Sequence, residues 1–548
     1  MTTQSLGRKL VCSLGATALT LTLTSTAAVT PAFAVDVVAS KPAEYGNIDA
    51  TAKGSIIVHK HQNQKAEYPQ YADPETGSFN GVPSAGVDGV TFDIYKLDYD
   101  LTTQQGWDEL EKLKIDKDTV KGKNPTSTQV TENGGKATFG NLGLGAYLVV
   151  ERDSSGARVS VDGQDVSVID QAAPFVVTIP YPNNHEERQG NKPNGKWLYN
   201  VNVFPKNSVS RMTKDVEDQA KHGLLLGSEV RYPVTAQIPT IPTGNKLKYF
   251  IITDKMSEHF DVNSLGVDTV QIGADGSVPL TEETDYKVTK VGNTVHVALT
   301  KAGLTKAGQH QEEYVHVTFK GKLTSVSYGS IDNGAEAYIG FIPNDDPSEP
   351  PTVPPVATPE DPEGGGARKP LNSPRVITKW GQVTILKKDA ADGQTGLKDA
   401  KFKVYAAKDP YPTDGKCVAE KGEEVKKNGQ EYTVTTGEEG KAVIDGLFVA
   451  DWKSGQPVKD FRCYVLEETE APAGFIKPKG DKALTPITVY PGTSKVDHEF
   501  KIENVKRDAP NLPLTGGQGV AAMMIAGGLL LAVSMGAAVV FVRRMRRQ

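Results

Sequence analysis

The sequence predicts an all-β protein made of β-sandwich domains in series. Short segments in which apolar and polar residues alternate recur along the chain, among them GSIIVHKH, GVTFDIYKL, GAYLVVERD, EYVHVTFKGKL, AKFKVYA and ITVYPG. A period of two is typical of half-buried strands. The 54 glycines and 34 prolines supply the turns that short strands need. Between the terminal segments 1–34 and 508–548 lie roughly 475 residues, enough for about three such domains.

The first 34 residues are predicted to be a secretory signal peptide. Arg8 and Lys9 precede an apolar, threonine-rich run, and Ala-Phe-Ala at positions 32–34 provides the small residues of a cleavage site. We therefore expect an exported protein whose mature chain begins at Val35.

Residues 35–206 are predicted to form the first domain. Within it, TTQQGWDELEKLK carries Trp107, Leu110 and Leu113 at a spacing of three. This spacing predicts a short amphipathic helix inserted among the strands.

The first domain ends in the stretch WLYNVNVFPKN, residues 197–207, which predicts a strand that stops at Pro205. Apolar residues occupy alternate positions of the stretch. If the alternation continues past the proline, Lys206 points to solvent and Asn207 points into the core. An exposed lysine usually only increases solubility, so Lys206 by itself indicates no function.

Two further domains are expected. The predicted segments are 207–342 for the middle domain, 343–374 for a linker or loop rich in proline and glycine, and 375–507 for the last domain. An acidic group in the loop, Asp345, Asp346 and Glu349, could bind Ca²⁺, but a solvated acidic loop is the favoured interpretation.

The C-terminal segment, residues 508–548, combines a short motif with a predicted membrane span. The uncharged run from Val520 to Val542 is long enough to cross a bilayer, and the arginines after it should stay in the cytoplasm. The motif ahead of the span consists of Leu512, Pro513, Leu514, Thr515 and Gly516. A plain single-pass anchor would explain the span but not the motif.

Composition excludes several classes of function. The net charge of -6 over 548 residues, without a basic block outside the termini, argues against a nucleic-acid partner. The nine histidines show no metal-ligand spacing, so neither a catalytic metal nor another cofactor is indicated. Cys12 leaves with the signal peptide. Cys417 and Cys463 remain in an exported chain, which favours a disulfide over a metal site or a reactive thiol.

Strand alternation places three polar side chains in the core of the last domain. Lys387, Glu468 and Asn504 each share a face with apolar neighbours, whereas Lys388 and Glu467 face outward. Burying an unpaired lysine and a glutamate is costly. The three groups are therefore expected either to react with one another or to form a buried ion pair with a hydrogen-bonded asparagine.

The other two domains offer similar sets of a lysine, an acid and an asparagine. Alternation places Lys214, Asp254 and Asn333 in the core of the middle domain, unless Lys214 is an ordinary surface residue near a domain start. In the first domain the candidates are Lys60, Glu151 and Asn207.

The last domain resembles a known family. CYVLEETEAPAGF, residues 463–475, resembles the pilin E-box YxLxETxAPxGY, with Phe475 in place of the final tyrosine. VTILKKDAADGQTGLKDAKFKVY and HEFKIENVK resemble the opening and closing strands of CnaB-type immunoglobulin-like domains. The resemblance implies an intramolecular isopeptide bond between Lys387 and Asn504, formed autocatalytically with the help of Glu468.

The resemblance extends to the other two domains. The middle triad is similar to that of the CnaA-like domain of actinobacterial shaft pilins, which implies a bond between Lys214 and Asn333 with Asp254 as the acid. In the first domain a bond between Lys60 and Asn207, assisted by Glu151, would be the counterpart. There, however, VVERDSSG lacks the TxAPxG continuation of an E-box.

WLYNVNVFPKN resembles the pilin motif WxxxVxVYPK, with Phe204 replacing tyrosine, and LPLTG fits the LPxTG sorting signal of Gram-positive bacteria. Together they are similar to a major, shaft-forming pilin of sortase-assembled pili. The family implies that a sortase cuts after Thr515, holds it as a thioacyl enzyme, and joins it to Lys206 of another copy.

The expected partners are a pilus-specific sortase, a housekeeping sortase, further copies of the chain, tip or minor pilins, peptidoglycan and an unidentified surface receptor. A monomeric wall-anchored adhesin would share the sorting signal but would not need the pilin motif. A secreted hydrolase would need a catalytic carboxylate pair, triad or metal, and no such pattern stands out. We therefore expect a structural subunit that is a sortase substrate and not an enzyme.

Overall fold

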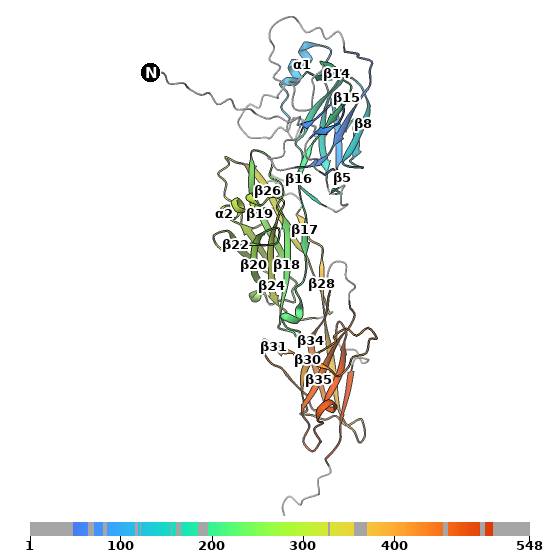
Figure 1. Cartoon of the computed structure of the whole chain (residues 1–548), viewed down its shortest axis with the longest axis vertical. Helices are drawn as coiled ribbons and strands as arrows, with labels where there is room; N and C mark the ends of the chain where they lie inside the picture. The colour runs from blue at the N-terminus through green and yellow to red at the C-terminus, as the bar shows by residue number, and fades with distance from the viewer. Residues whose placement is uncertain are drawn as a thin grey trace, which may run out of the picture.

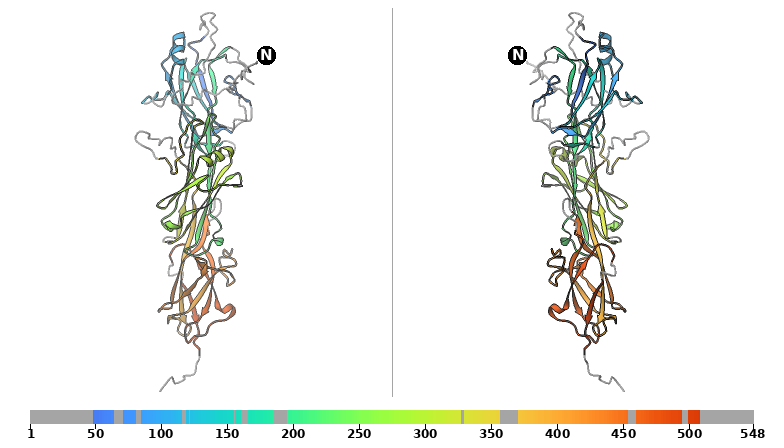
Figure 2. Two further views of the ribbon diagram at one scale, coloured as in Figure 1. Left: turned by 90° about the vertical axis from the view of Figure 1, so that its left-hand side faces the viewer. Right: turned by 90° about the vertical axis from the view of Figure 1, so that its right-hand side faces the viewer.

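The computed structural model describes residues 48–63, 71–80, 85–115, 119–120, 122–154, 156–159, 166–184, 195–326, 329–355, 370–452, 459–493 and 499–507. In this part of the chain, three β-rich bodies follow one another along a single long axis (Figure 1). Views turned by 90° show the same narrow, extended shape (Figure 2). The all-β prediction is confirmed.

The first domain packs two main sheets around its own hydrophobic core. One sheet has the order β15-β1-β8 and the other β12-β9-β6-β7, while β11-β16-β2 forms a small sheet towards the middle domain. The bounds are β1 (Gly54–His59), β2 (His61–Gln62), β6 (Thr91–Leu97), β7 (Ser127–Val130), β8 (Lys136–Leu142), β9 (Gly145–Asp153), β11 (Ser167–Asp170), β12 (Phe175–Ile179), β15 (Asn200–Val203) and β16 (Lys206–Ser210).

Short elements complete the first domain. They are β3 (Tyr71–Ala72), β4 (Phe79–Asn80), β5 (Val87–Asp88), β10 (Arg158–Val159), β13 (Tyr181–Asn183), β14 (Lys196–Leu198) and α1 (Gln104–Glu111). The predicted helix is confirmed as α1, whose first turn is capped by the Thr103 hydroxyl accepting from the Gly106 N–H. Leu110 is buried on its inner face.

The middle domain consists of two five-stranded sheets, β17-β18-β24-β20-β21 and β22-β23-β19-β26-β27. Their bounds are β17 (Met212–Lys214), β18 (Glu229–Gln237), β19 (Asn245–Lys255), β20 (Gly266–Gly273), β21 (Val278–Pro279), β22 (Tyr286–Val291), β23 (Thr294–Leu299), β24 (Tyr314–Lys322), β26 (Ala335–Pro343) and β27 (Leu371–Asn372), with α2 (Lys301–Gln309), η1 (Gln219–Lys221) and η2 (Val262–Ser264) between them. Because β27 pairs with β26, the end of the predicted linker or loop returns to the middle domain.

The last domain places one sheet, in which β28 pairs with β34 and β37, against a second sheet of order β30-β29-β35-β36, and β28 also pairs with β25 of the middle domain. The bounds are β25 (Ser330–Asn333), β28 (Val376–Asp389), β29 (Lys401–Ala407), β30 (Lys421–Glu424), β31 (Lys426–Lys427), β32 (Gln430–Glu431), β33 (Thr433–Thr435), β34 (Lys441–Trp452), β35 (Arg462–Glu470), η3 (Gly480–Ala483), β36 (Leu484–Val489) and β37 (Glu499–Asn504).

Strands continue across both domain junctions. Only Arg211 separates β16 of the first domain from β17 of the middle domain. The 14-residue strand β28 pairs with β25 near its start and with β37 near its end, and it lies between the middle and last bodies in Figure 1. The apolar cores of the middle and last domains form one continuous cluster, so these two domains are joined by packing as well as by chain.

Candidate functional site

The last domain brings its predicted triad together in a buried cluster. Lys387 donates from Nζ to Glu468 Oε2 at 2.7 Å and to Asn504 Oδ1 at 2.6 Å. Asn504 in turn donates from Nδ2 to Glu468 Oε1 at 2.6 Å. All three side chains are buried, with Lys387 at 0% exposure. Each glutamate oxygen thus has one partner, and the amine lies next to the amide carbonyl.

The first domain contains the same arrangement, although it lacks an E-box. Lys60 donates to Glu151 Oε2 at 2.8 Å and also to Asn207 Oδ1, and Asn207 Nδ2 donates to Glu151 Oε1 at 2.7 Å. A backbone N–H, that of Ala172, adds a 3.0 Å hydrogen bond to Glu151 Oε2. The three side chains are buried. Glu151 therefore contacts both the lysine and the asparagine, although the E-box sequence is missing around it.

Strand register explains why the two clusters are alike. In the last domain β28 and β37 run parallel, and Asn504 pairs with Asp389, two residues after Lys387. In the first domain β2 and β16 run parallel, and Asn207 pairs with Gln62, two residues after Lys60. A shift of two along a strand keeps the same face, so lysine and asparagine point into the core together.

The acids come from the opposite sheet beside equivalent aromatic residues. Glu151 on β9 pairs with Phe92, and Glu468 on β35 pairs with Phe402. Each lysine Nζ lies 5.6 Å from the ring centroid of the phenylalanine of its own domain. These rings exclude water from the amine while tolerating its charge.

The middle cluster has a different pattern of contacts. Lys214 on β17 donates to Asp254 Oδ2, and Asn333 Nδ2 lies 3.4 Å from the same oxygen. Within the described residues, Asp254 Oδ1 and Asn333 Oδ1 have no hydrogen-bond partner although both are buried. Lys214 Nζ lies 4.7 Å from the ring centroid of Tyr232. The shorter aspartate thus contacts lysine and asparagine through a single oxygen.

Burial shifts the pKa of three of these groups in the direction that the expected isopeptide chemistry needs. Desolvation lowers the pKa of Lys387 and of Lys214, although the neighbouring carboxylates oppose the shift. Desolvation also raises the pKa of Asp254, against the opposing effect of Lys214. A neutral amine is a nucleophile, and a protonated carboxyl can polarise an amide carbonyl.

Lys206 does not point freely into solvent as the alternation predicted. It begins β16, which lies between β2 and β11, and it pairs with His61 in the parallel register. The side chain is partly buried, and this burial lowers the pKa of Lys206 to about 8. The prediction that the strand stops at Pro205 is confirmed, because β15 ends at Val203. A second strand, β16, then starts at Lys206 and continues to Ser210.

The cysteine prediction is confirmed. Cys417 and Cys463 form a disulfide with their Cα atoms 5.4 Å apart. The bridge ties the loop after β29 to β35, and the Cys463 N–H also donates to the Pro410 carbonyl at 2.9 Å. Because β35 carries Glu468, the disulfide fixes the strand that supplies the acid.

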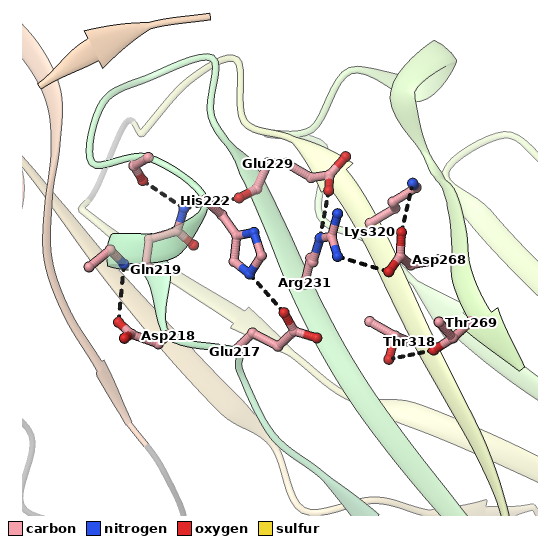
Figure 3. A network of polar contacts seen from close by, with 12 residues as sticks. Glu217, Asp218, Gln219, His222, Glu229, Arg231, Asp268, Thr269, Thr318 and Lys320 are labelled. Atoms are coloured by element: carbon pink, nitrogen blue, oxygen red, sulfur yellow. Dashed lines mark hydrogen bonds and ion pairs between the residues drawn. The ribbon is translucent and has the colours of Figure 1, made fainter. Parts of the chain in front are cut away.

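A polar network lies on the outer face of the middle domain (Figure 3). Arg231 contacts Glu229 at 2.7 Å and Asp268 at 2.8 Å, and Lys320 contacts Asp268 at 3.1 Å. These ion pairs join β18, β20 and β24, and each is partly exposed to water. Exposed pairs stabilise a fold only slightly, so the network is no candidate for catalysis.

The segment between β17 and β18 contacts the last domain. Buried Gln219 holds its loop by donating to the backbone oxygens of Gly223 and Glu229 at 2.8 and 2.9 Å (Figure 3). The Leu224 carbonyl then accepts from the Phe448 N–H of β34 at 2.9 Å. These bonds connect the two domains beside their shared core.

The sorting residues Leu512, Pro513, Leu514, Thr515 and Gly516 lie outside the described residues, as do the predicted signal peptide and membrane span. Of the helices that the structure describes, none is long and apolar enough to cross a membrane. Among the described side chains, Asp345, Asp346 and Glu349 included, no group of three or more His, Cys, Asp or Glu could hold a metal ion.

Sequence reasoning missed two contributors to the middle cluster. The Tyr232 ring lies against Lys214, and Met256 Sδ accepts from Asn333 Nδ2 at 3.4 Å. Alternation beyond Asp254 would have placed Met256 on the same inner face, but a buried methionine looks like ordinary core.

Comparison with known proteins covers nearly the whole chain. A family model for the N-terminal domain D1 of Gram-positive pilin subunits matches residues 51–208, and one for a prealbumin-like fold domain matches residues 381–504. The chain is 34% identical over 530 residues to the fimbrial subunit type 2 of Actinomyces naeslundii, covering 92% of each chain. It is 30% identical over 528 residues to the fimbrial subunit type 1 of Actinomyces viscosus, covering 91% of this chain and 92% of the relative.

A solved structure supports the same fold. The full-length major pilin SpaD of Corynebacterium diphtheriae is 25% identical, with a TM-score of 0.61, 84% of this chain covered and 99% of that chain covered.

Proposed function

The chain belongs to the Gram-positive pilins that include these fimbrial subunits, and on that premise we propose that it is a shaft subunit polymerised covalently by a sortase. As a member of this family it is a structural subunit of a surface pilus. The observation that carries the finer proposal is the lysine of the pilin motif, Lys206, held in a strand at the junction of the first and middle domains.

Lys206 is the proposed nucleophile of polymerisation. The sortase cuts between Thr515 and Gly516 and holds the Thr515 carbonyl as a thioester. The neutral Lys206 amine of another copy attacks that carbonyl, the carbon–sulfur bond breaks, and the enzyme thiolate leaves as the amide forms and the amine gives up a proton. A pKa lowered by burial makes more of the amine neutral near physiological pH. Pro205 fixes the backbone immediately before Lys206.

Each of the three buried clusters is proposed to form an intramolecular isopeptide bond. The lysine amine attacks the side-chain carbonyl carbon of the asparagine, the bond from that carbon to the amide nitrogen breaks, and ammonia leaves with the proton that the lysine gives up. The acid, which is Glu468 in the last domain, carries that proton. No oxidant, water or external enzyme is required. The chain is thus a sortase substrate whose only catalysis acts on itself.

The bonds suit a subunit that carries tension. Force enters at Lys206 and leaves at Thr515. Two of the proposed bonds would each transmit the force across most of a domain. They are the bond between Lys214 and Asn333 and the bond between Lys387 and Asn504. Between them, the pairing of β25 with β28 joins the two domains. The shaft would then resist extension through covalent bonds.

The partners follow from this role. They are a pilus-specific sortase for chain growth, a housekeeping sortase for attachment to peptidoglycan, tip or minor pilins, and further copies of the chain. The proposed location is the cell wall, with the fibre extending outward.

Substitution of Lys206 tests the proposal. Lys206→Ala should abolish the high-molecular-weight ladder on immunoblots of wall extracts, while secretion and wall attachment of the monomer persist. Lys206→Arg is the matched control, because it keeps charge and length but does not react as an amine nucleophile. A sortase-dependent ladder in either variant would refute the role of Lys206. A single band in the wild type would instead indicate a monomeric wall-anchored adhesin.

A further inference from the structure

In the clusters of the first and last domains, here called the outer clusters, the asparagine amide donates to a carboxylate oxygen that the lysine does not use. In the middle cluster a methionine sulfur takes the place of that oxygen. Met256 follows the end of β19, two residues after Asp254, and both side chains point inward because alternate residues share a face. Asn333 Nδ2 lies 3.4 Å from Met256 Sδ and 3.4 Å from Asp254 Oδ2. The asparagine amide is therefore held between the acid and the thioether.

The backbone of Met256 is fixed on both sides by one residue. The Met256 N–H donates to the Asn293 carbonyl at 3.0 Å, and Asn293 Nδ2 donates to the Met256 carbonyl at 2.5 Å. The side chain is 1% exposed. A long, flexible side chain is thus anchored at its base and enclosed at its tip, which keeps the sulfur next to the amide.

The outer clusters show what the sulfur replaces. Glu468 uses Oε2 for the lysine and Oε1 for the asparagine amide. Asp254 uses Oδ2 for both, and its Oδ1 has no partner among the described residues. Met256 Sδ provides the second acceptor for the amide nitrogen that the shorter acid does not provide.

We propose that Met256 is a positioning residue for the isopeptide bond between Lys214 and Asn333, and that it holds the leaving nitrogen of the asparagine. The inference rests on the proposed bond in the middle domain. A thioether accepts hydrogen bonds and donates none, so it favours the amide orientation with Nδ2 towards the sulfur.

This orientation of the amide determines where each step of the proposed reaction takes place. The Lys214 amine attacks the side-chain carbonyl carbon of Asn333, and the carbon–nitrogen bond to Nδ2 breaks. Asp254 passes the lysine proton to Nδ2, which leaves as ammonia from the side where Met256 and Asp254 meet. A rotated amide would direct its carbonyl oxygen at the sulfur and its nitrogen away from the acid.

Isosteric replacement of the sulfur provides the test. Of the seven methionines, only Met212 and Met256 lie between residues 35 and 507. In the full-length chain carrying Met212→Leu, growth on norleucine removes the sulfur at position 256 but keeps the length of the side chain, whereas growth on selenomethionine keeps an acceptor of similar shape. The readout is the rate at which the Lys214–Asn333 cross-linked peptide appears after a pulse of synthesis.

We expect the norleucine protein to form this bond roughly two- to tenfold more slowly than the selenomethionine protein, as the loss of one weak hydrogen bond predicts. The Lys387–Asn504 bond of the same molecules is the internal control and should form at an equal rate in both. Met256→Leu should slow the bond in the same way, and Met212→Leu alone should not.

Equal rates with norleucine and selenomethionine would overturn the role of Met256, because a purely structural side chain serves equally well without sulfur. Absence of the Lys214–Asn333 bond from the wild-type protein would refute the proposed bond itself. The two failures are therefore distinguishable in one set of peptide maps.

Discussion

The first and last domains hold nearly identical clusters at different positions relative to the proposed inter-subunit linkage. In both, the asparagine pairs two residues beyond the lysine in a parallel register, and the glutamate comes from the opposite sheet beside a phenylalanine. Lys387 and Asn504 lie in the chain between Lys206 and Thr515, whereas Lys60 lies before Lys206 and so outside that segment. The last bond would therefore carry tension, while the first would lie outside the path of the load.

Asn207 gives the first cluster another role. It directly follows Lys206 in β16, and its side chain is held by Lys60 and Glu151. A bond there would fix the backbone next to the amine that we propose as the nucleophile in the sortase reaction. On this proposal the same reaction would serve two purposes, which are resistance to load in the last domain and presentation of a nucleophile in the first.

The largest effect is expected from Glu468→Ala. Without the acid, Lys387 and Asn504 should stay unbonded. The variant should therefore not lose the ammonia that the wild type releases when this bond forms. Closing a loop of this length contributes about 5 kcal/mol on the chain-entropy estimate, so the last domain should lose much of its thermal and proteolytic resistance. Intact mass and thermal unfolding measure both effects.

Glu467→Ala is the matched control for this variant. Glu467 is the neighbouring E-box carboxylate, and it faces outward to contact Lys421 at 2.9 Å. Its removal should leave the bond formed. A fully formed Lys387–Asn504 cross-link in Glu468→Ala would disprove the role of the acid.

Glu151→Ala should have a similar effect on the stability of the first domain, again about 5 kcal/mol, but a different effect on function. We expect incorporation through Lys206 to slow, while any fibre that forms keeps the extensibility of the wild type under load. Single-fibre force measurements check the second part. A fibre that lengthens as much as one made from the Glu468→Ala variant would contradict the assigned path of the load.

Strand alternation in the sequence predicted part of these sites. Alternation correctly placed Lys387, Glu468 and Asn504 inside, because parity along a strand is local information. It also placed Asn207 inside. The sequence could not show that β16 lies between β2 and β11, because strand pairing across the chain is not local, and for that reason Lys206 was expected to be exposed.

Polar residues buried by distant segments were missed for the same reason. Asn202 alternates with apolar neighbours in WLYNVNVFPKN, a pattern that by itself places its side chain on the outer face. It is buried instead, and its polar atoms have partners there, since Nδ2 donates to the Pro74 carbonyl at 3.1 Å and Oδ1 contacts His59 at 2.8 Å. The E-box identified the last cluster, but nothing comparable marked the first, where only parity and the acid indicated the site.

Removing the disulfide should have a smaller effect than removing either glutamate. The Cys417→Ser variant, paired with Cys463→Ser, opens a shorter loop and should destabilise the last domain by about 3 to 4 kcal/mol. The first domain should be unaffected, so the unfolding temperatures of the first and last domains should differ more than in the wild type. An unchanged unfolding temperature for the last domain would show that the bridge adds nothing beyond the proposed isopeptide bond.

The smallest effect concerns pH. Because burial lowers the pKa of Lys206 to about 8, the neutral fraction of the amine should reach one half near that pH and level off about one pH unit higher. Sortase-catalysed coupling to Lys206 should follow this curve, while coupling to a free lysine peptide should keep rising towards its ordinary pKa. Identical profiles for the two amines would show that the strand does not activate Lys206.

Peptide mapping of the exported protein tests the central claim most directly. If the three clusters react, the intact mass falls short of the sequence mass by three ammonia molecules, after allowance for loss of the signal peptide, cleavage after Thr515 and the disulfide. The cross-linked peptides then join Lys60 to Asn207, Lys214 to Asn333 and Lys387 to Asn504. A mass without any ammonia loss, with all three lysines recovered in linear peptides, would show that the clusters are only buried ion pairs.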